Sequence, residues 1–182
     1  MKAPLFAMPA IVALALLNMS ATARAQVEGA SIIVASTGPV VATYQGNTAA
    51  YSNDLYLDSP ANSVGLIFNN HADPVGLTKN LGTFNAGDEL VFRLHVNDTG
   101  DNFFSGPASR NVDNHTHARV TENWQPGETL VEFEDLNGGP YNYNDLSFSF
   151  TNTRSATVPE PGSLALMAAG LLPGLALLRR KR

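Results

Sequence analysis

The stretch E-L-V-F-R-L-H-V, residues Glu89–Val96, decides the fold class because apolar side chains occupy every second position. Successive side chains of an extended strand point to opposite faces of a sheet, so this alternation predicts a strand with one buried face. The residues predicted on that face are Leu90, Phe92, Leu94 and Val96.

Other segments of the chain have the same character. Residues 146–150 alternate too. The side chains of Leu146, Phe148 and Phe150 are expected to point inward, and those of Ser147 and Ser149 to point outward. Further β-branched or apolar segments, separated by Gly, Pro, Asn and Ser, lie at residues 31–35, 40–44, 54–57, 64–68, 117–121 and 129–133. About eight short strands without sustained helical periodicity predict an all-β fold, an antiparallel, jelly-roll-like β-sandwich.

The beginning of the sequence has the pattern of a signal peptide. Lys2 provides a positive charge, residues 11–17 are apolar, and Ala23-Arg24-Ala25 forms a small-x-small cleavage site. A transmembrane anchor is the alternative, but the apolar run is short for a span of about 20 residues. We therefore expect a signal-peptide helix at residues 1–25, cut by signal peptidase after Ala25.

The other end of the sequence combines a short motif, an apolar run at residues 164–178 and a basic cluster. Basic residues after an apolar helix stay in the cytoplasm, so the rest of the chain is expected across the membrane. The motif and the cluster consist of Pro159, Glu160, Pro161, Arg179, Arg180, Lys181 and Arg182. An ordinary single-span anchor is the alternative. This segment resembles the PEP-CTERM sorting signal of exported bacterial proteins, which implies recognition and cleavage by an exosortase.

These patterns divide the sequence into four parts. A signal peptide at 1–25 precedes a β-sandwich domain at 26–153. A polar, Pro-containing linker with the Pro-Glu-Pro motif follows at 154–162. A hydrophobic sorting helix with its basic tail is expected at 163–182.

Composition limits the chemistry of the domain. The whole chain has a formal charge of −5, but residues 26–158 hold five basic and fifteen acidic side chains, a charge of about −10. An acidic domain repels phosphate backbones, so nucleic acid is not an expected partner. The chain has no cysteine, which excludes thiol catalysis and thiolate metal sites and leaves oxygen ligands and four histidines.

An acidic segment, F-E-D-L-N-G-G-P-Y-N-Y-N-D-L-S-F at residues 133–148, follows one predicted strand and enters the last. Carboxylate and amide oxygens in a glycine-containing loop suit Ca²⁺. The candidate ligands are Glu134, Asp135, Asn142, Asn144 and Asp145. The alternative is that Asp135 and Asp145 cap a turn by accepting backbone N–H bonds, with the two asparagines in left-handed positions.

The same segment is similar to the carboxyl-terminal signature of a bacterial domain family of unknown function, found in exported PEP-CTERM proteins and large adhesins. The family pattern is roughly F-E-D-x-x-G-G-D-x-D-Y-N-D-x-x-F. Residues 104–120 also resemble this family. Pro140 and Asn142 stand where the pattern usually has acids, so fewer charged ligands are expected here than in the family.

Weaker patterns suggest other sites. His115 and His117 share one face of an extended segment, and with His95 or Asp113 they form a candidate zinc or iron site. Hydrogen bonding within a polar loop is the preferred interpretation. Ser105, His115 and Asp113 supply the residue types of a serine hydrolase, but no G-x-S-x-G motif is present.

Two features of the sequence are relevant to hydrolysis or binding of carbohydrate. Adjacent Glu134 and Asp135 are expected on opposite faces of a strand, which suits a glycosidase pair poorly. Trp124, Tyr141 and Tyr143 are candidates for stacking on sugars, although closing the core is the preferred role for Trp124.

The sequence as a whole predicts an exported, surface-sorted protein of the cell envelope or exopolysaccharide matrix, with a binding or structural role and no catalytic residues. A weak Ca²⁺ site and contact with polysaccharide are part of this prediction. The protein is expected to pass through an inner-membrane intermediate and then to stay on the cell surface or become extracellular. The alternative is a secreted hydrolase that acts on polysaccharide.

Overall fold

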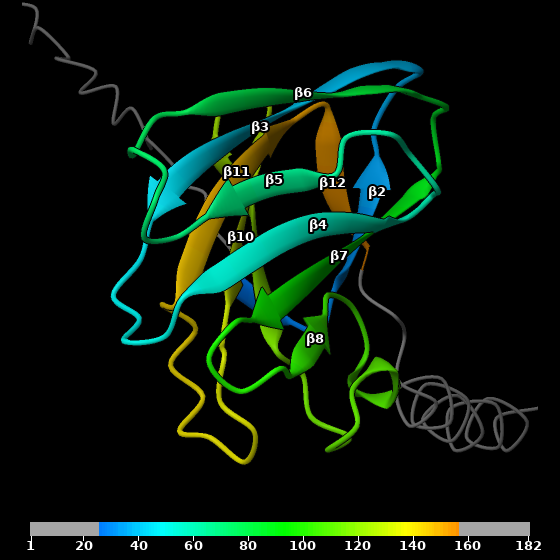
Figure 1. Ribbon diagram of the computed structural model, residues 1–182. Helices are drawn as coiled ribbons and strands as arrows, with labels where there is room; N and C mark the ends of the chain where they lie inside the picture. Colours follow the sequence, from blue (N-terminus) through cyan, green and yellow to red (C-terminus); the bar gives the residue numbers. More distant parts are fainter. Residues whose placement is uncertain (1–25, 157–182) are drawn as a thin grey trace, which may run out of the picture.

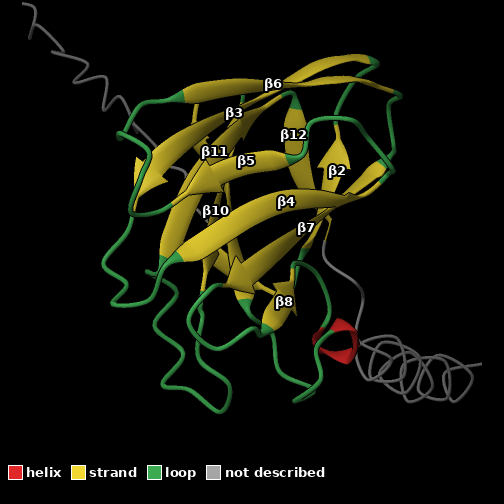
Figure 2. Ribbon diagram, in the orientation of Figure 1, coloured by secondary structure: helices red, strands yellow, loops and turns green. Residues whose placement is uncertain are grey.

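A computed structural model describes residues 26–156 of the chain, which form almost entirely β-structure (Figure 2). The helices expected at 1–25 and 163–182 lie outside the described residues. Within the described part, the only helix is the single 3-10 turn Ala108–Arg110. Between residues 26 and 156 there is no helix with the length and apolar character needed to cross a membrane.

The strands form two antiparallel sheets (Figure 1). The first sheet contains, in spatial order, β1 (Gln26–Glu28), β9 (Ala118–Gln125), β10 (Glu128–Phe133), β11 (Leu146–Thr151), β3 (Gly38–Gly46) and β6 (Thr78–Phe84). The second contains β12 (Thr153–Ala156), β2 (Ser31–Val34), β7 (Glu89–Val96), β4 (Asn53–Ser59) and β5 (Leu66–Asn69), with β8 (Asn102–Phe104) paired to β7. For residues 26–156, the prediction of an all-β fold with antiparallel sheets is confirmed.

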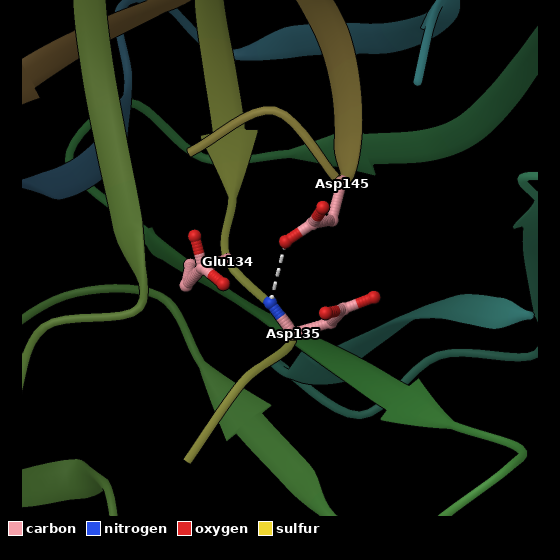
Figure 3. Close-up of side chains that lie close together, drawn as sticks. All are labelled: Glu134, Asp135 and Asp145. Atoms are coloured by element: carbon pink, nitrogen blue, oxygen red, sulfur yellow. Dashed lines mark hydrogen bonds between the residues drawn. The ribbon is translucent and has the colours of Figure 1, made fainter. Parts of the chain in front are cut away.

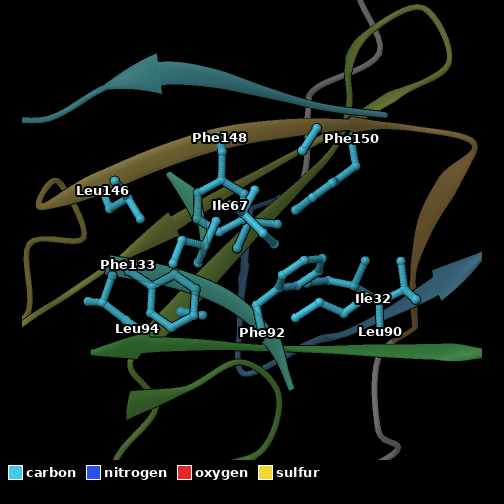
Figure 4. Close-up of a cluster of buried hydrophobic side chains, with 14 of the residues drawn as sticks. Ile32, Ile67, Leu90, Phe92, Leu94, Phe133, Leu146, Phe148 and Phe150 are labelled. Atoms are coloured by element: carbon cyan, nitrogen blue, oxygen red, sulfur yellow. The ribbon is translucent and has the colours of Figure 1, made fainter. Parts of the chain in front are cut away.

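The core lies between the two sheets, which contribute facing aromatic side chains (Figure 4). On β7 the four residues predicted to be buried are all buried. Phe92 from this strand stacks on Phe150 of β11, with ring centroids 4.4 Å apart, and contacts Phe148 at 5.7 Å. Because these contacts join the two sheets, the burial of apolar surface, aromatic and aliphatic, holds the sheets together.

The structure corrects two details of the sequence-based prediction. Ser149 is buried, not exposed, because the Gln45 side chain covers it and donates a hydrogen bond to its Oγ (2.9 Å). Residues 154–156, predicted as linker, belong to β12, which pairs with β2 in the second sheet. The domain therefore extends to at least Ala156. The sequence did not reveal this strand because backbone pairing alone forms it, and a short polar segment gives no apolar pattern to recognise.

Candidate metal centre

The centre lies where strands β10 and β11 leave the first sheet. The two strands pair as far as Phe133 and Leu146, so the residues just beyond that pair come together. The Asp145 backbone N–H donates to the Phe133 carbonyl (3.0 Å), and the Asp135 backbone N–H donates to Asp145 Oδ2 (2.9 Å). Figure 3 shows the resulting approach of Asp135 and Asp145.

Three acidic side chains meet at this point. Glu134, Asp135 and Asp145 are 1, 4 and 8 % exposed, and each offers a carboxylate oxygen within 4.8 Å of the other two. Among residues 26–156, none of the three forms an ion pair with a basic side chain. Buried carboxylates without a cationic partner are costly, and a hard divalent cation would neutralise them.

Of the five predicted ligands, the structure thus brings together the three acids. Asn142 is exposed, and its backbone N–H donates to Glu134 Oε2 (2.8 Å). Asn144 is half-buried, and its carbonyl accepts a hydrogen bond from the Thr48 backbone N–H (2.8 Å). Strand β10 ends at Phe133, so Glu134 and Asp135 lie just beyond it, and their side chains leave the backbone on opposite sides while each still offers a carboxylate oxygen to the group (Figure 3).

The acids also order the loop. Asp145 accepts a backbone N–H bond, as the capping interpretation expected, and Glu134, which that interpretation did not include, accepts three more. Glu134 accepts hydrogen bonds from the backbone N–H groups of Leu136 (3.3 Å), Asn142 (2.8 Å) and Tyr143 (3.3 Å). Besides Gly138 and Gly139, the residue of this loop with a left-handed conformation is Tyr143, with φ 54°, rather than either asparagine. Charge-assisted bonds of this kind fix the loop around the carboxylates.

Asn53 also contacts the acidic centre, although nothing in the sequence singled it out. Asn53, the first residue of β4, donates a hydrogen bond from Nδ2 to Asp135 Oδ2 (2.7 Å). It stands 82 positions before Asp135, and no local motif marks it. Only the packing of the second sheet against the first brings the two residues together.

Burial and mutual repulsion change the titration of two of these acids. Burial, together with the charges of Asp145 and Asp98, raises the pKa of Asp135 to about 6 against an opposing hydrogen bond from Asn53. Burial and the charge of Glu134 raise the pKa of Asp145 to about 6, although the Asp135 backbone N–H opposes the change. Both acids therefore hold protons more tightly in the folded protein than in the unfolded chain.

These raised pKa values predict that the free energy of unfolding falls as the pH rises from about 4 to 6.5 in a chelating buffer. In this window the folded state binds more protons than the unfolded state, so each rise in pH favours unfolding. Urea unfolding at several pH values measures the effect, and the double variant Asp135→Asn/Asp145→Asn should lose most of it. Equal pH dependence in both proteins would contradict the prediction.

A buried histidine lies beside the centre. His117 Nδ1 is 3.0 Å from the Glu134 carbonyl oxygen, and His117 Nε2 is 2.9 Å from Asp113 Oδ2. Both ring nitrogens therefore lie within hydrogen-bond distance of an oxygen of the domain. The ring also stacks on Phe103, with centroids 3.8 Å apart. His117 consequently has no free nitrogen for a metal or for proton transfer.

Asp113 ties two loops together. Burial acts to raise its pKa, but hydrogen bonds from His117, the His115 backbone N–H and the Tyr141 hydroxyl outweigh burial and lower the pKa to about 2. Asp113 is therefore ionised at neutral pH. Through His117 and Tyr141 it joins the loop that precedes β9 to the loop between β10 and β11.

The histidines do not gather into a metal site. His115 is exposed and stacks on Tyr141, with centroids 5.1 Å apart, whereas His95 lies on β7 and contacts Asn102 Oδ1 (3.1 Å). In the part of the chain that the structure describes, the three acids form the only group of His, Asp or Glu side chains spaced to hold a metal.

The residue types of a serine hydrolase are also kept apart. Ser105 is buried, and its Oγ accepts a hydrogen bond from the Phe92 backbone N–H (2.9 Å). The carboxylate of Asp113 contacts the imidazole of His117 and only the backbone of His115. Ser105, Asp113 and His115 are therefore close in sequence, but their side chains do not form the hydrogen bonds of a catalytic triad.

Among the candidate sugar-stacking residues, Tyr143 is buried, and Trp124 is half-buried on β9. Tyr141 packs against His115 and, edge-on, against His117 at 5.4 Å. These two contacts give the Tyr141 ring a packing role in the domain.

Residues 157–182 match the PEP-CTERM protein-sorting motif. The match confirms the resemblance of the sorting signal, which lies outside the described residues. Such a motif indicates an exported protein that passes through the membrane to the cell surface, and it implies processing by an exosortase-type enzyme. No curated protein and no solved structure matches the chain.

Proposed function

We propose that the chain is an exported, non-catalytic protein of the cell envelope or exopolysaccharide matrix, and that Ca²⁺ binds between Glu134, Asp135 and Asp145. The observation that carries the cation proposal is the burial of these three carboxylates within 4.8 Å of one another without a basic partner among residues 26–156. The sorting motif supports the location.

Ca²⁺ is preferred over other metals because the ligands are all hard oxygens in an irregular loop. Mg²⁺ demands near-octahedral geometry and keeps several waters, which a site this buried accommodates poorly. Extracellular Ca²⁺ modules commonly bind with dissociation constants of about 0.1–1 mM. An affinity in that range would leave the site occupied outside the cell and empty in the cytoplasm.

Three observations, one each on the acids, Ser105 and His117, favour a binding or structural role over hydrolysis of polysaccharide. A glycosidase presents two carboxylates to opposite sides of a scissile bond, whereas these acids are almost completely buried, with carboxylate oxygens within 4.8 Å of one another. Ser105 Oγ is engaged by the Phe92 backbone, and both nitrogens of His117 face acceptors. No catalytic residue is assigned.

Calcium is expected to raise the melting temperature of the purified protein. An ion that binds only the folded state adds about 2.7 kcal/mol of stability at one hundred times its dissociation constant, which corresponds to several degrees for a domain of this size. Thermal melts with 10 mM CaCl₂, 10 mM MgCl₂ or EDTA measure the effect. An unchanged melting temperature in CaCl₂ would contradict the proposal, as would an equal shift in the Asp135→Asn/Asp145→Asn variant.

A further inference from the structure

Asn53 reaches the acidic centre from the opposite sheet. It is completely buried at the start of β4, which lies between β7 and β5 in the second sheet. Its Nδ2 donates to Asp135 Oδ2 at 2.7 Å, which places its terminal amide directly against one of the three carboxylates. The centre is therefore formed by both sheets, although its acids all come from the segment between β10 and β11.

The amide oxygen of Asn53 is buried and has no hydrogen-bond partner. Within residues 26–156, only Asn144 Oδ1 and Thr121 Oγ1 share this property. Buried acceptors are nearly always satisfied, so each exception calls for an explanation. Asn144 directly precedes Asp145, so two of the three orphaned oxygens belong to residues adjacent to the carboxylates.

Asn70 holds Asn53 firmly in this place. The Asn53 backbone N–H donates to Asn70 Oδ1 (2.8 Å), and the Asn70 N–H donates to the Asn53 carbonyl (3.0 Å). Asn70 Nδ2 donates in turn to the carbonyls of Tyr51 (2.9 Å) and Asp145 (3.4 Å). This double clamp fixes the backbone of Asn53 beside the centre.

We infer that Asn53 Oδ1 is a ligand of the same cation as Glu134, Asp135 and Asp145, so that one Ca²⁺ joins the two sheets. The inference rests on the proposed function, because it requires that a cation binds. Turning the amide about its Cβ–Cγ bond exchanges Nδ2 and Oδ1. With a cation present, the oxygen faces the ion beside Asp135. Without one, Nδ2–H donates to Asp135.

A cation accounts for the group better than a shared proton does. A proton on one carboxylate satisfies a single acceptor at a time, whereas Ca²⁺ takes six to eight oxygens. Three carboxylates and the Asn53 amide supply four, and Asn144 Oδ1 and water are available for the remainder. Neutral amide oxygens are ordinary Ca²⁺ ligands, and they add coordination without more buried negative charge.

Two substitutions at Asn53 separate its oxygen from its N–H donor. Asn53→Ala removes both, whereas Asn53→Asp keeps an oxygen and loses the donor. Thr121→Val is the matched control, because it removes the third orphaned atom at a position on β9 opposite Leu130, away from the acids. Calorimetric titration of the purified proteins with Ca²⁺ gives the affinities, and melts in EDTA show that each variant is folded.

We expect Asn53→Ala to weaken Ca²⁺ binding at least tenfold, Asn53→Asp to bind as tightly as the natural protein or more tightly, and Thr121→Val to be unchanged. Equal loss in both Asn53 variants would assign the effect to the N–H bond with Asp135 and overturn the inference. Wild-type affinity in both would also overturn it, while the proposed function stands. Absence of Ca²⁺ binding to the natural protein would overturn both.

Discussion

Replacing Phe148 by alanine is expected to lower the free energy of unfolding by about 3–5 kcal/mol. Phe148 is completely buried on β11. Its ring centroid lies 5.7 Å from that of Phe92 in the second sheet, 5.8 Å from that of Phe133 and 5.0 Å from that of Phe150. The substitution removes a large apolar side chain and leaves a cavity between the sheets, and close-packed neighbours relax only partly into such a space.

Urea unfolding monitored by circular dichroism measures this loss. Val112 provides the control, because its side chain is 98 % exposed and Val112→Ala should change the free energy of unfolding by less than about 0.5 kcal/mol. A Phe148→Ala protein as stable as the Val112→Ala protein would show that the two sheets are not held together by this aromatic contact.

Glu134→Ala is expected to destabilise the protein by about 3 kcal/mol, mainly by removing the acceptor of three backbone N–H groups that are buried or partly buried. Its carboxylate accepts hydrogen bonds from three backbone N–H groups, those of Leu136, Asn142 and Tyr143. Relief of the repulsion with Asp145 offsets part of this loss. Glu134→Gln keeps one acceptor oxygen, so we expect it to cost less stability while still weakening Ca²⁺ binding.

Glu132 is the matched control for Glu134, two positions earlier on β10. Its carboxylate pairs with Arg119 at 3.0 Å, and both side chains are partly exposed to water. Exposed pairs contribute about 0–1 kcal/mol, so Glu132→Ala should have a small effect. Comparable destabilisation by Glu132→Ala and Glu134→Ala in urea unfolding would contradict the capping role of Glu134.

The sequence predicted the fold where strands have an apolar face and failed where pairing alone makes a strand. Strand β7 was identified because its side chains alternate between the core and the outside. Strand β6 was missed because the sequence T-K-N-L-G-T-F buries only Leu81 and Phe84 at the edge of the first sheet. In β12 only Thr153 is buried, so its composition resembles that of a linker.

The sequence likewise predicted one part of the candidate centre and missed another. The meeting of Glu134, Asp135 and Asp145 was predictable, because two adjacent strands bring their flanking residues together. The contribution of Asn53 was not, because it depends on how the second sheet packs on the first. The turn was also misassigned, since the left-handed residue other than glycine is Tyr143, a residue type that rarely adopts that conformation.

The most direct test is a crystal structure of the protein grown with millimolar CaCl₂. We expect one ion, bound at about 2.3–2.6 Å by oxygens of Glu134, Asp135, Asp145 and Asn53. Anomalous scattering at a long wavelength would identify the ion as calcium. Finding these four side chains hydrogen-bonded to one another, with no ion among them at that concentration, would contradict the account.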